Sequence, residues 1–461
     1  MIIVELFAGV GGFRLGLEGY KPKNKKEFYS LQNGFKKGFT KSLINHQDLF
    51  ITGFANQFEP STPSKQHAAE VYKERFPDGT METADINNID GVQVLDKIKK
   101  TVPKNRFKED LILVGGFPCQ DYSVAQGLHK SKGIQGKKGV LWWSIFQLLQ
   151  DLKDLNKQPK FLLLENVDRL IKSPRDARGK DFTILLHCLY FLGYDVEYQV
   201  INAAEYGFPQ RRRRVFIFAN LREGQSKKAV LKKAFPFSIL HSSDPLRLFE
   251  ELKSRKDLDE QLLDYNQGWD YLRSPYQNYG TIKDGVLETH KVLPTPGNIK
   301  KTTFADIIQR KKTDGEIPSG FFLADSDIPK WEKAKGKASI ERIGLNRDTG
   351  QRDFEYKFSI GKMATFESLD KPLRTIITSE GGKAALRTKH IVDVTKSRGG
   401  KYETGKRRLT PLELERANCF PDFFTLNEDI SDTKRAFLMG NALVIGVVER
   451  IRNAIIENYD L

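Results

Sequence analysis

The sequence lacks any apolar run long enough to span a membrane, and it contains few cysteines. No stretch approaches the roughly 18 consecutive apolar residues of a transmembrane helix, and the opening Met-Ile-Ile-Val-Glu lacks the basic and apolar regions of a signal peptide. The three cysteines, Cys119, Cys188 and Cys419, are far apart and form no Cys-x-x-Cys pair. This spacing argues against a disulfide framework or a zinc site. We therefore expect a soluble, cytoplasmic protein without a bound metal, in a compartment that keeps a working thiol reduced.

Acidic residues are outnumbered by basic ones. The 75 lysines and arginines against 59 acidic residues give a formal net charge of +16. Such an excess favours a polyanionic partner, because phosphate contacts release condensed counterions. Basic charge that only keeps the protein soluble is the alternative. With 461 residues, 39% of them hydrophobic, the chain can bury one large core or two, and we expect two domains.

Residues 110–123 combine the pattern of a buried strand with a cysteine. Residues 111–115 are apolar and lean towards β-branched types, and Gly115, Gly116 and Pro118 end the run. Cys119 therefore follows the carboxyl end of a strand, where ligands and reactive groups collect in open α/β sheets. A small buried apolar side chain is the alternative for a free cysteine.

The N-terminus has the pattern of a strand, a glycine turn and a helix start. The apolar residues 2–7 lead into Phe-Ala-Gly-Val-Gly-Gly-Phe, and residues 14–18 look helical. Glycines let a backbone approach a ligand closely, and a helix start offers free N–H groups. Gly9, Gly11 and Gly12 do not match the dinucleotide pattern G-x-G-x-x-G, which favours a ligand without a pyrophosphate. A tight turn that binds nothing is the alternative.

Two acidic residues follow in positions that suit a nucleoside. After a lysine-rich insert at residues 20–48, residues 51–58 read as a strand, and Glu59 comes at its end. A carboxylate there suits the two hydroxyls of a ribose. Asp85 repeats the arrangement one unit later and could accept from an adenine amino group. A solvated loop aspartate is the alternative for Asp85.

Further motifs follow two later strands. Residues 161–164 predict a strand that delivers Glu165-Asn166-Val167 to the same sheet edge as Cys119. A carboxylate at that edge is costly unless it has a partner or a task. Gln-Arg-Arg-Arg-Arg at 210–214 enters a strand at 215–219, so alternate arginines should share a face. A solvated basic patch is the alternative for the arginine run.

The strand and helix alternation fades in the middle of the chain. Residues 221–396 read as an irregular, basic second domain, whose best-defined piece is a β-type run closed by a glycine turn at 371–382. Regular signals then return. Thr410 and Pro411 predict a helix start, with the acid of the capping box displaced by one position. That helix should run to about 418, and residues 443–455 suit a closing helix.

Four motifs therefore occur in order: Phe-Ala-Gly-Val-Gly-Gly, Gly-Phe-Pro-Cys-Gln, Glu-Asn-Val and Gln-Arg-Arg-Arg-Arg. Over residues 1–220 and 400–461 the sequence resembles the DNA (cytosine-5) methyltransferases of bacterial restriction-modification systems. The resemblance implies an α/β fold, with a Rossmann-like S-adenosylmethionine-dependent methyltransferase sheet and a smaller, irregular target-recognition domain. It implies a catalytic domain at 1–220, the target-recognition domain at 221–396, and a segment at 397–461 that returns to the catalytic domain.

The resemblance also implies the reaction. Such enzymes flip a cytosine out of duplex DNA and methylate its C5 from S-adenosylmethionine. Cys119 matches the nucleophile that adds to C6. Glu165 matches the carboxyl group that contacts N3 and the exocyclic amine. Arg214 matches the arginine on the cytosine O2, and Arg212 its supporting neighbour.

Residues that bind the cofactor and DNA follow from the same resemblance. The cofactor set is Phe7, Gly9, Gly11, Gly12, Glu59, Asp85, Ile86, Leu141 and Asn441. The DNA-binding set is Gln120, Ser123, Gln210, Arg374, Thr375, Ile376, Arg387 and Lys389. Thr375-Ile376 resembles a threonine-hydrophobic pair that recurs in the recognition domain. Phosphate contact is the alternative to base reading for the basic members of the second set.

The resemblance leads us to expect a monomer on double-stranded DNA, associated with the bacterial nucleoid, with no membrane partner. A restriction endonuclease would act on the same site without direct contact. An RNA cytosine methylase is a second hypothesis, which the large middle region disfavours. A catalytically inactive DNA-binding relative is a third, which the intact catalytic motifs disfavour. A nucleotide-dependent oxidoreductase is a fourth, and the missing pyrophosphate motif counts against it.

Overall fold

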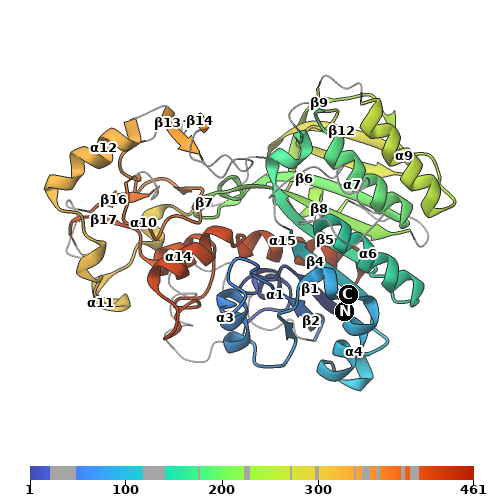
Figure 1. Cartoon of the computed structure of the whole chain (residues 1–461), viewed down its shortest axis with the longest axis horizontal. Coiled ribbons are helices and arrows are strands. Elements are labelled where there is room, and N and C mark those ends of the chain that lie inside the picture. Colours follow the sequence, from blue (N-terminus) through green and yellow to red (C-terminus); the bar gives the residue numbers. More distant parts are fainter. Residues whose placement is uncertain are drawn as a thin grey trace.

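The structure is a computed structural model of the chain. It describes residues 1–20, 48–117, 141–174, 177–222, 229–269, 273–295, 301–336, 339–344, 354–359, 364–385, 390–394 and 404–461. Two lobes are visible in Figure 1: a larger lobe built on a sheet, and a smaller lobe that contains α10 to α12 and β13 to β17. Within the described residues, no helix combines the length and apolar character needed to cross a bilayer.

A parallel sheet forms the centre of the larger lobe, as the sequence predicts. Its strands run in the order β3-β2-β1-β4-β5, and β8 and β6 follow, with β8 antiparallel to both of its neighbours. The strands are β1 (Ile2–Leu6), β2 (Ile51–Asn56), β3 (Met81–Glu82), β4 (Leu111–Gly116), β5 (Phe161–Val167), β6 (Tyr194–Asn202) and β8 (Arg213–Leu221).

The strand order reverses at β1, which lies between β2 and β4. In open α/β sheets, ligands bind outside the carboxyl ends of the strands at such a point. β1 and β4 also approach closely, since a Cβ on Gly115 would lie 2.9 Å from the Leu6 carbonyl oxygen. The loops after β1 and β4, which carry the glycine motif and Cys119, therefore start at the same crevice.

Helices cover both faces of the sheet. The helices form two sets, one on each face of the sheet. One apolar cluster contains Ile3 of β1 and residues of the first set. A second cluster contains Ile2 and Val4 of β1 and residues of the second set. The alternation follows from the period of two in a strand. The first set is α1 (Gly12–Leu17), α3 (His67–Arg75), α8 (Val230–Ala234) and α15 (Ile445–Tyr459); the second is α4 (Gly91–Thr101), α6 (Leu141–Asp154) and α7 (Lys180–Phe191).

The main sheet continues into residues that we predicted to lie in the second domain. β11 pairs with β6, and further antiparallel strands follow outward from it. These elements are β9 (Phe237–Ser242), β10 (Leu246–Arg247), β11 (Tyr279–Lys283), β12 (Val286–Pro294) and α9 (Arg255–Gln267). The strands between residues 237 and 294 therefore extend the main sheet, because β11 pairs with the edge of β6 that would otherwise be free. The sequence of β9 is a weak signal for a strand of this sheet, since one buried residue is followed by five exposed ones.

The smaller lobe consists of short elements, as its irregular sequence predicts. They are α10 (Phe304–Ile307), α11 (Lys311–Asp314), α12 (Ile328–Gly336), β13 (Ser339–Gly344), β14 (Phe354–Ser359), β15 (Leu373–Arg374), β16 (Ile391–Asp393) and β17 (Lys406–Arg408). The β-type run predicted at 371–382 contains only the two residues of β15, which pair in parallel with β7 (Gln210–Arg211). Short 3-10 helices connect elements at Ile86–Asn88, Lys104–Arg106, Asp168–Lys172, Ala203–Tyr206, Ser319–Phe321 and Asp325–Asp327.

The C-terminal segment adds α13 (Pro411–Ala417) and α14 (Asp432–Asn441) before α15. Thr410 and Glu413 form a complete capping box on α13, so the displaced acid that we predicted is wrong: Glu413 occupies the third helical position.

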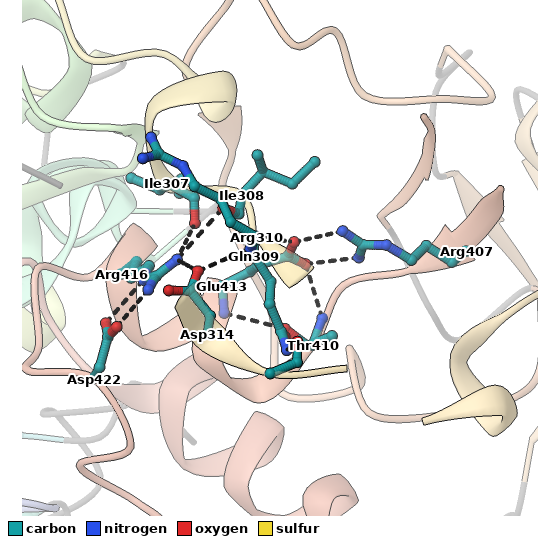
Figure 2. A network of polar contacts seen from close by, with 11 residues as sticks. Ile307, Ile308, Gln309, Arg310, Asp314, Arg407, Thr410, Glu413, Arg416 and Asp422 are labelled. Carbon is teal, nitrogen blue, oxygen red and sulfur yellow. Dashed lines mark hydrogen bonds and ion pairs between the residues drawn. The ribbon is translucent and has the colours of Figure 1, made fainter. Parts of the chain in front are cut away.

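Buried ion pairs attach α13 to the smaller lobe (Figure 2). Glu413 accepts from Arg407 Nη1 at 2.9 Å and from the Gln309 amide at 2.9 Å. Arg416 bonds to both Asp314 and Asp422. Because each charge is buried with its partner, breaking one pair would leave an uncompensated charge. The C-terminal segment and the segment around α10 and α11 are therefore packed as one body.

The buried acid Glu449 on α15 makes the fold sensitive to pH. Burial raises its pKa from 4.5 to about 7, and its ion pair to Arg452 Nη2 spans 3.5 Å. The folded state holds this proton more tightly than the unfolded chain does. Stability is therefore lost as the pH rises from 4.5 to about 7, and the loss persists above that.

We predict that Glu449→Gln raises the melting temperature by about 1–3 °C at pH 8 and leaves it nearly unchanged at pH 5. Glu457→Gln is the matched control, because Glu457 lies on the same helix with an exposed side chain. Thermal unfolding followed by circular dichroism measures both variants. An equal shift at the two pH values would contradict the prediction.

Candidate functional site

The glycine turn after β1 is shaped for a close approach of a ligand. Phe7, Gly9 and Gly11 all have positive φ angles, of 53°, 56° and 92°. A Cβ on Gly11 would lie 2.7 Å from a ring carbon of Phe76, so only glycine fits there. A Cβ on Gly9 would have no atom of the described residues within 4 Å, so open space lies beside the backbone. The Gly9 amide donates to Gln57 Oε1 at 2.8 Å, which ties the turn to the end of β2.

Glu59 follows β2 and is held by its backbone. Its amide donates to Gln66 Oε1 at 2.6 Å, and its carbonyl accepts from Gln66 Nε2 at 3.1 Å. One carboxylate oxygen, Oε1, lies 3.4 Å from Lys434 Nζ. The other, Oε2, is buried and has no hydrogen-bond partner among the described residues. A buried carboxylate oxygen without a donor fits a site that a ligand hydroxyl completes.

The remaining predicted cofactor residues lie on neighbouring elements. Asp85 caps the 3-10 helix that begins at Ile86, whose side chain is buried. This turn contacts α6, which begins at the half-buried Leu141. Asn441 ends α14 with an exposed side chain.

The C-terminal segment reaches the glycine turn from α14. A Cβ on Gly12 would lie 3.1 Å from Cγ of Leu443, just past the end of that helix. Residues from both ends of the chain therefore lie beside the glycine turn.

The carboxyl end of β5 places Glu165 beside the end of β4. Glu165 is the register partner of Gly116, three residues before Cys119, and its Oε1 lies 2.9 Å from Arg214 Nε. Cys119, Gln120 and Ser123 lie outside the described residues. Asn166, the next residue of the motif, is buried and donates from Nδ2 to the Phe117 carbonyl at 3.0 Å. This bond holds the chain two residues before Cys119.

Arg212 is a buried cation at the junction of three segments. Its Nη1 donates to the Ile376 carbonyl at 3.3 Å and its Nη2 to the Gly440 carbonyl at 3.2 Å. Burial and the neighbouring Arg214 charge lower its pKa to about 9. Arg212 therefore remains charged at neutral pH and contributes a positive field behind the Glu165–Arg214 pair.

The four arginines alternate, as the strand pattern predicts. Arg212 is buried and Arg214 bonds to Glu165, whereas Arg211 and Arg213 are exposed. Arg213 has 59% of its side chain exposed and lies 3.4 Å from Asp168 Oδ2. The run therefore presents two arginines to the interior and two to solvent.

Three residues predicted to bind DNA lie where β15 meets β7. Arg374 Nε donates to Glu367 Oε1 at 2.7 Å, and Thr375 Oγ1 donates to the Arg211 carbonyl at 2.7 Å. Ile376 is buried. The threonine-hydrophobic pair therefore packs the segment after β15 against the arginine run at β7.

Gln210 is also buried, and its amide is occupied within the protein. Its Nε2 donates to the Ala417 carbonyl and to Asn418 Oδ1, and its Oε1 accepts from the Ile376 amide. DNA contact by Gln210 would require these bonds to be broken. Arg387 and Lys389 lie outside the described residues.

Sequence reasoning missed two residues of this site. Asn166 belongs to the Glu-Asn-Val motif, and its place directly after Glu165 at the end of a strand indicates a position at the same sheet edge. Lys434 gave no signal, because its contact with Glu59 joins residues 375 positions apart.

The chain is similar to known proteins along most of its length. The family described as C-5 cytosine-specific DNA methylase matches residues 1–457. Type II methyltransferase M.Sau3AI of Staphylococcus aureus is 38% identical, covering 98% of this chain and 95% of that protein. M.BanI of Aneurinibacillus aneurinilyticus is 25% identical over 99% of this chain and 95% of that protein.

Solved structures show the same fold. The Dnmt2 methyltransferase of S. pombe aligns with a TM-score of 0.53 over 100% of this chain and 99% of that chain, at 13% identity. The predicted α/β methyltransferase fold is confirmed. The full-length match to the family model and to M.Sau3AI shows that the chain belongs to the C-5 cytosine-specific DNA methylases, which makes it a DNA (cytosine-5) methyltransferase that uses S-adenosylmethionine.

Proposed function

We propose that the enzyme methylates a flipped-out cytosine at the edge formed by β4, β5 and β8, through a covalent bond between Cys119 and C6. The observation that carries the proposal is the Glu165–Arg214 pair, joined at 2.9 Å at the end of β5. N3 and O2 of cytosine are adjacent on one edge of the ring. Two groups that read them must therefore be neighbours, as this carboxyl and this guanidinium are.

Cys119 supplies the thiolate. Its sulfur forms the bond to C6, and the displaced electron pair moves into the ring, where Glu165 supports it at N3 and Arg214 at O2. C5 then has enamine character and accepts the methyl group. Loss of the C5 proton and of the thiolate restores the aromatic ring and the enzyme.

The other two cysteines do not fit this role. Burial raises the pKa of Cys188 to about 12 and also raises the pKa of Cys419, and both side chains are buried. A thiol needs to ionise to act as a nucleophile. Cys119 is the remaining thiol, and it follows in sequence the end of β4, where Gly116 is the register partner of Glu165.

The cofactor site consists of the glycine turn after β1, Glu59 and the segment around Asp85. Glu59 Oε2 accepts from the ribose, and the open space at Gly9 admits the cofactor beside the backbone. When bound, S-adenosylmethionine supplies an electrophilic methyl group.

We also propose that the enzyme is the modification methylase of a type II restriction-modification system. The similarity to M.Sau3AI extends over 98% of the chain, which includes the smaller lobe. A restriction endonuclease acting on the same site would be the functional partner. Bisulfite sequencing of DNA from cells that express the protein, beside cells that express M.Sau3AI, would identify the methylated site and show whether the two agree.

We predict that the enzyme transfers tritium from labelled S-adenosylmethionine to cytosine C5 of duplex DNA, and that Cys119→Ala abolishes the transfer. A duplex containing 5-fluorocytosine should trap a covalent adduct, because C5 then has no proton to lose. Cys188→Ala and Cys419→Ala, checked for folding, should still form it. Labelling of RNA alone, or an adduct with Cys119→Ala, would disprove the assignment.

Asn166 is expected to act by positioning Cys119. Asn166→Ala removes the donor to the Phe117 carbonyl, and we predict that kcat falls by about 10-fold or more while the KM for S-adenosylmethionine stays within about twofold. Asn202→Ala, which removes an exposed bond to Glu205, is the control. An unchanged kcat in a folded Asn166→Ala protein would refute the positioning role.

Arg211 and Arg213 are expected to contact DNA phosphates. Each lost phosphate contact lowers the slope of log K against log salt by about 0.9, so Arg211→Gln with Arg213→Gln should reduce the slope by about 2. Arg247→Gln is the matched control, because Arg247 is similarly exposed and paired with Glu250 at 3.9 Å at the far end of the sheet. Fluorescence anisotropy with a duplex measures the slopes, and equal slopes in all proteins would contradict the proposal.

A further inference from the structure

Glu59 is a largely buried acid whose carboxylate has few hydrogen-bond partners among the described residues. Its side chain is 12% exposed, Gln66 contacts only its backbone groups, and its Oε2 has no donor among the described residues. A carboxylate in such surroundings has hydrogen-bonding capacity that a nearby cation or a ligand hydroxyl can satisfy. Lys434 Nζ, 3.4 Å from Oε1, is the cation that the structure places there.

The ammonium of Lys434 is held in place. It lies 4.5 Å from the ring centroid of Phe437, one turn later on α14, which is within the range of a cation–π contact. The Lys434 amide donates to Ser431 Oγ at the start of the helix. The position of the charge is therefore set by α14 rather than by the loop that carries Glu59.

The helix itself is fixed to the recognition segment and to the catalytic edge. A Cβ on Gly440 would lie 2.4 Å from the backbone of Ile377, and one on Gly381 would lie 2.6 Å from Cα of Thr433. Arg212 bonds to the Gly440 carbonyl. α14 therefore cannot shift without disturbing these contacts.

We propose that Lys434 is a positioning residue of the cofactor site: it binds Oε1 of Glu59 and fixes the orientation of the carboxylate, so that Oε2 is left to accept from the ribose of S-adenosylmethionine. The inference rests on the proposed role of Glu59 as the ribose ligand. Lys434 does not touch the reacting atoms, so its loss should weaken cofactor binding and leave the chemical step intact.

Steady-state tritium transfer with full-length protein tests the proposal at saturating DNA. We expect Lys434→Met to raise the KM for S-adenosylmethionine by about 3- to 10-fold, with kcat within about twofold of the unmodified enzyme. Lys434→Arg should restore most of the affinity, because it keeps the charge. The dissociation constant of S-adenosylhomocysteine, measured by calorimetry, should rise in parallel with the KM.

Lys97→Met is the matched control. Lys97 is similarly exposed and lies 3.5 Å from Glu82, a pair like Lys434 and Glu59 in distance, although the Glu82 side chain is 43% exposed against 12% for Glu59. Its substitution should leave the KM unchanged. The duplex affinity should be unchanged in both lysine variants, and thermal melting confirms that each is folded.

A double-mutant cycle with Glu59→Gln separates the possible outcomes. If Lys434 acts through Glu59, Lys434→Met adds nothing once Glu59 is neutral. Additive effects, an unchanged KM in Lys434→Met, or equal losses of kcat and DNA affinity would each overturn the inference while the proposed function stands. An unchanged KM in Glu59→Gln would instead disprove the ribose-binding role of Glu59, and the inference with it.

Discussion

The buried guanidinium of Arg212 is the contact on which the arrangement of the site depends. Among the described residues no carboxylate forms an ion pair with it, and it instead donates to the carbonyl oxygens of Ile376 and Gly440. A buried cation is costly unless its donors are satisfied, so the two backbone segments must stay where they can accept. One side chain therefore joins the arginine run, the segment at Ile376 and α14.

This junction explains why the C-terminal segment returns to the larger lobe. α14 is held by Arg212 at one end, and Lys434 on the same helix reaches Glu59. At α13, the buried pair of Arg407 with Glu413 joins the smaller lobe to the same segment. The C-terminal segment contacts both the proposed cofactor residues and the proposed recognition residues, and buried charges hold it in place. Such charges specify one geometry, because any other leaves them unpaired.

The sequence predicted the elements whose signals are local. The apolar runs of β1, β4 and β5 and their glycine or acidic ends were sufficient to place Glu165 next to the strand that precedes Cys119. The extension of the sheet by β9 to β12 was missed, because antiparallel edge strands with solvent on one face lack a clear apolar run. The sequence does not predict the hydrogen bonds of Gln210 and Thr375 either. Both bond to partners that pairing between β7 and β15 brings together.

The arginine run shows how one motif can carry two tasks. In the sequence, Arg211 to Arg214 are four equivalent cations. A solvated basic patch explains them as well as a catalytic site does. Strand geometry makes them unequal, since alternate side chains face opposite ways. The interior pair loses water and gains specific partners, which concentrates its field on the proposed cytosine site. The exposed pair keeps its water and is suited to phosphates, whose attraction needs charge but no fixed geometry. Burial, rather than residue type, therefore separates the two arginines proposed to act in catalysis from the two proposed to bind DNA.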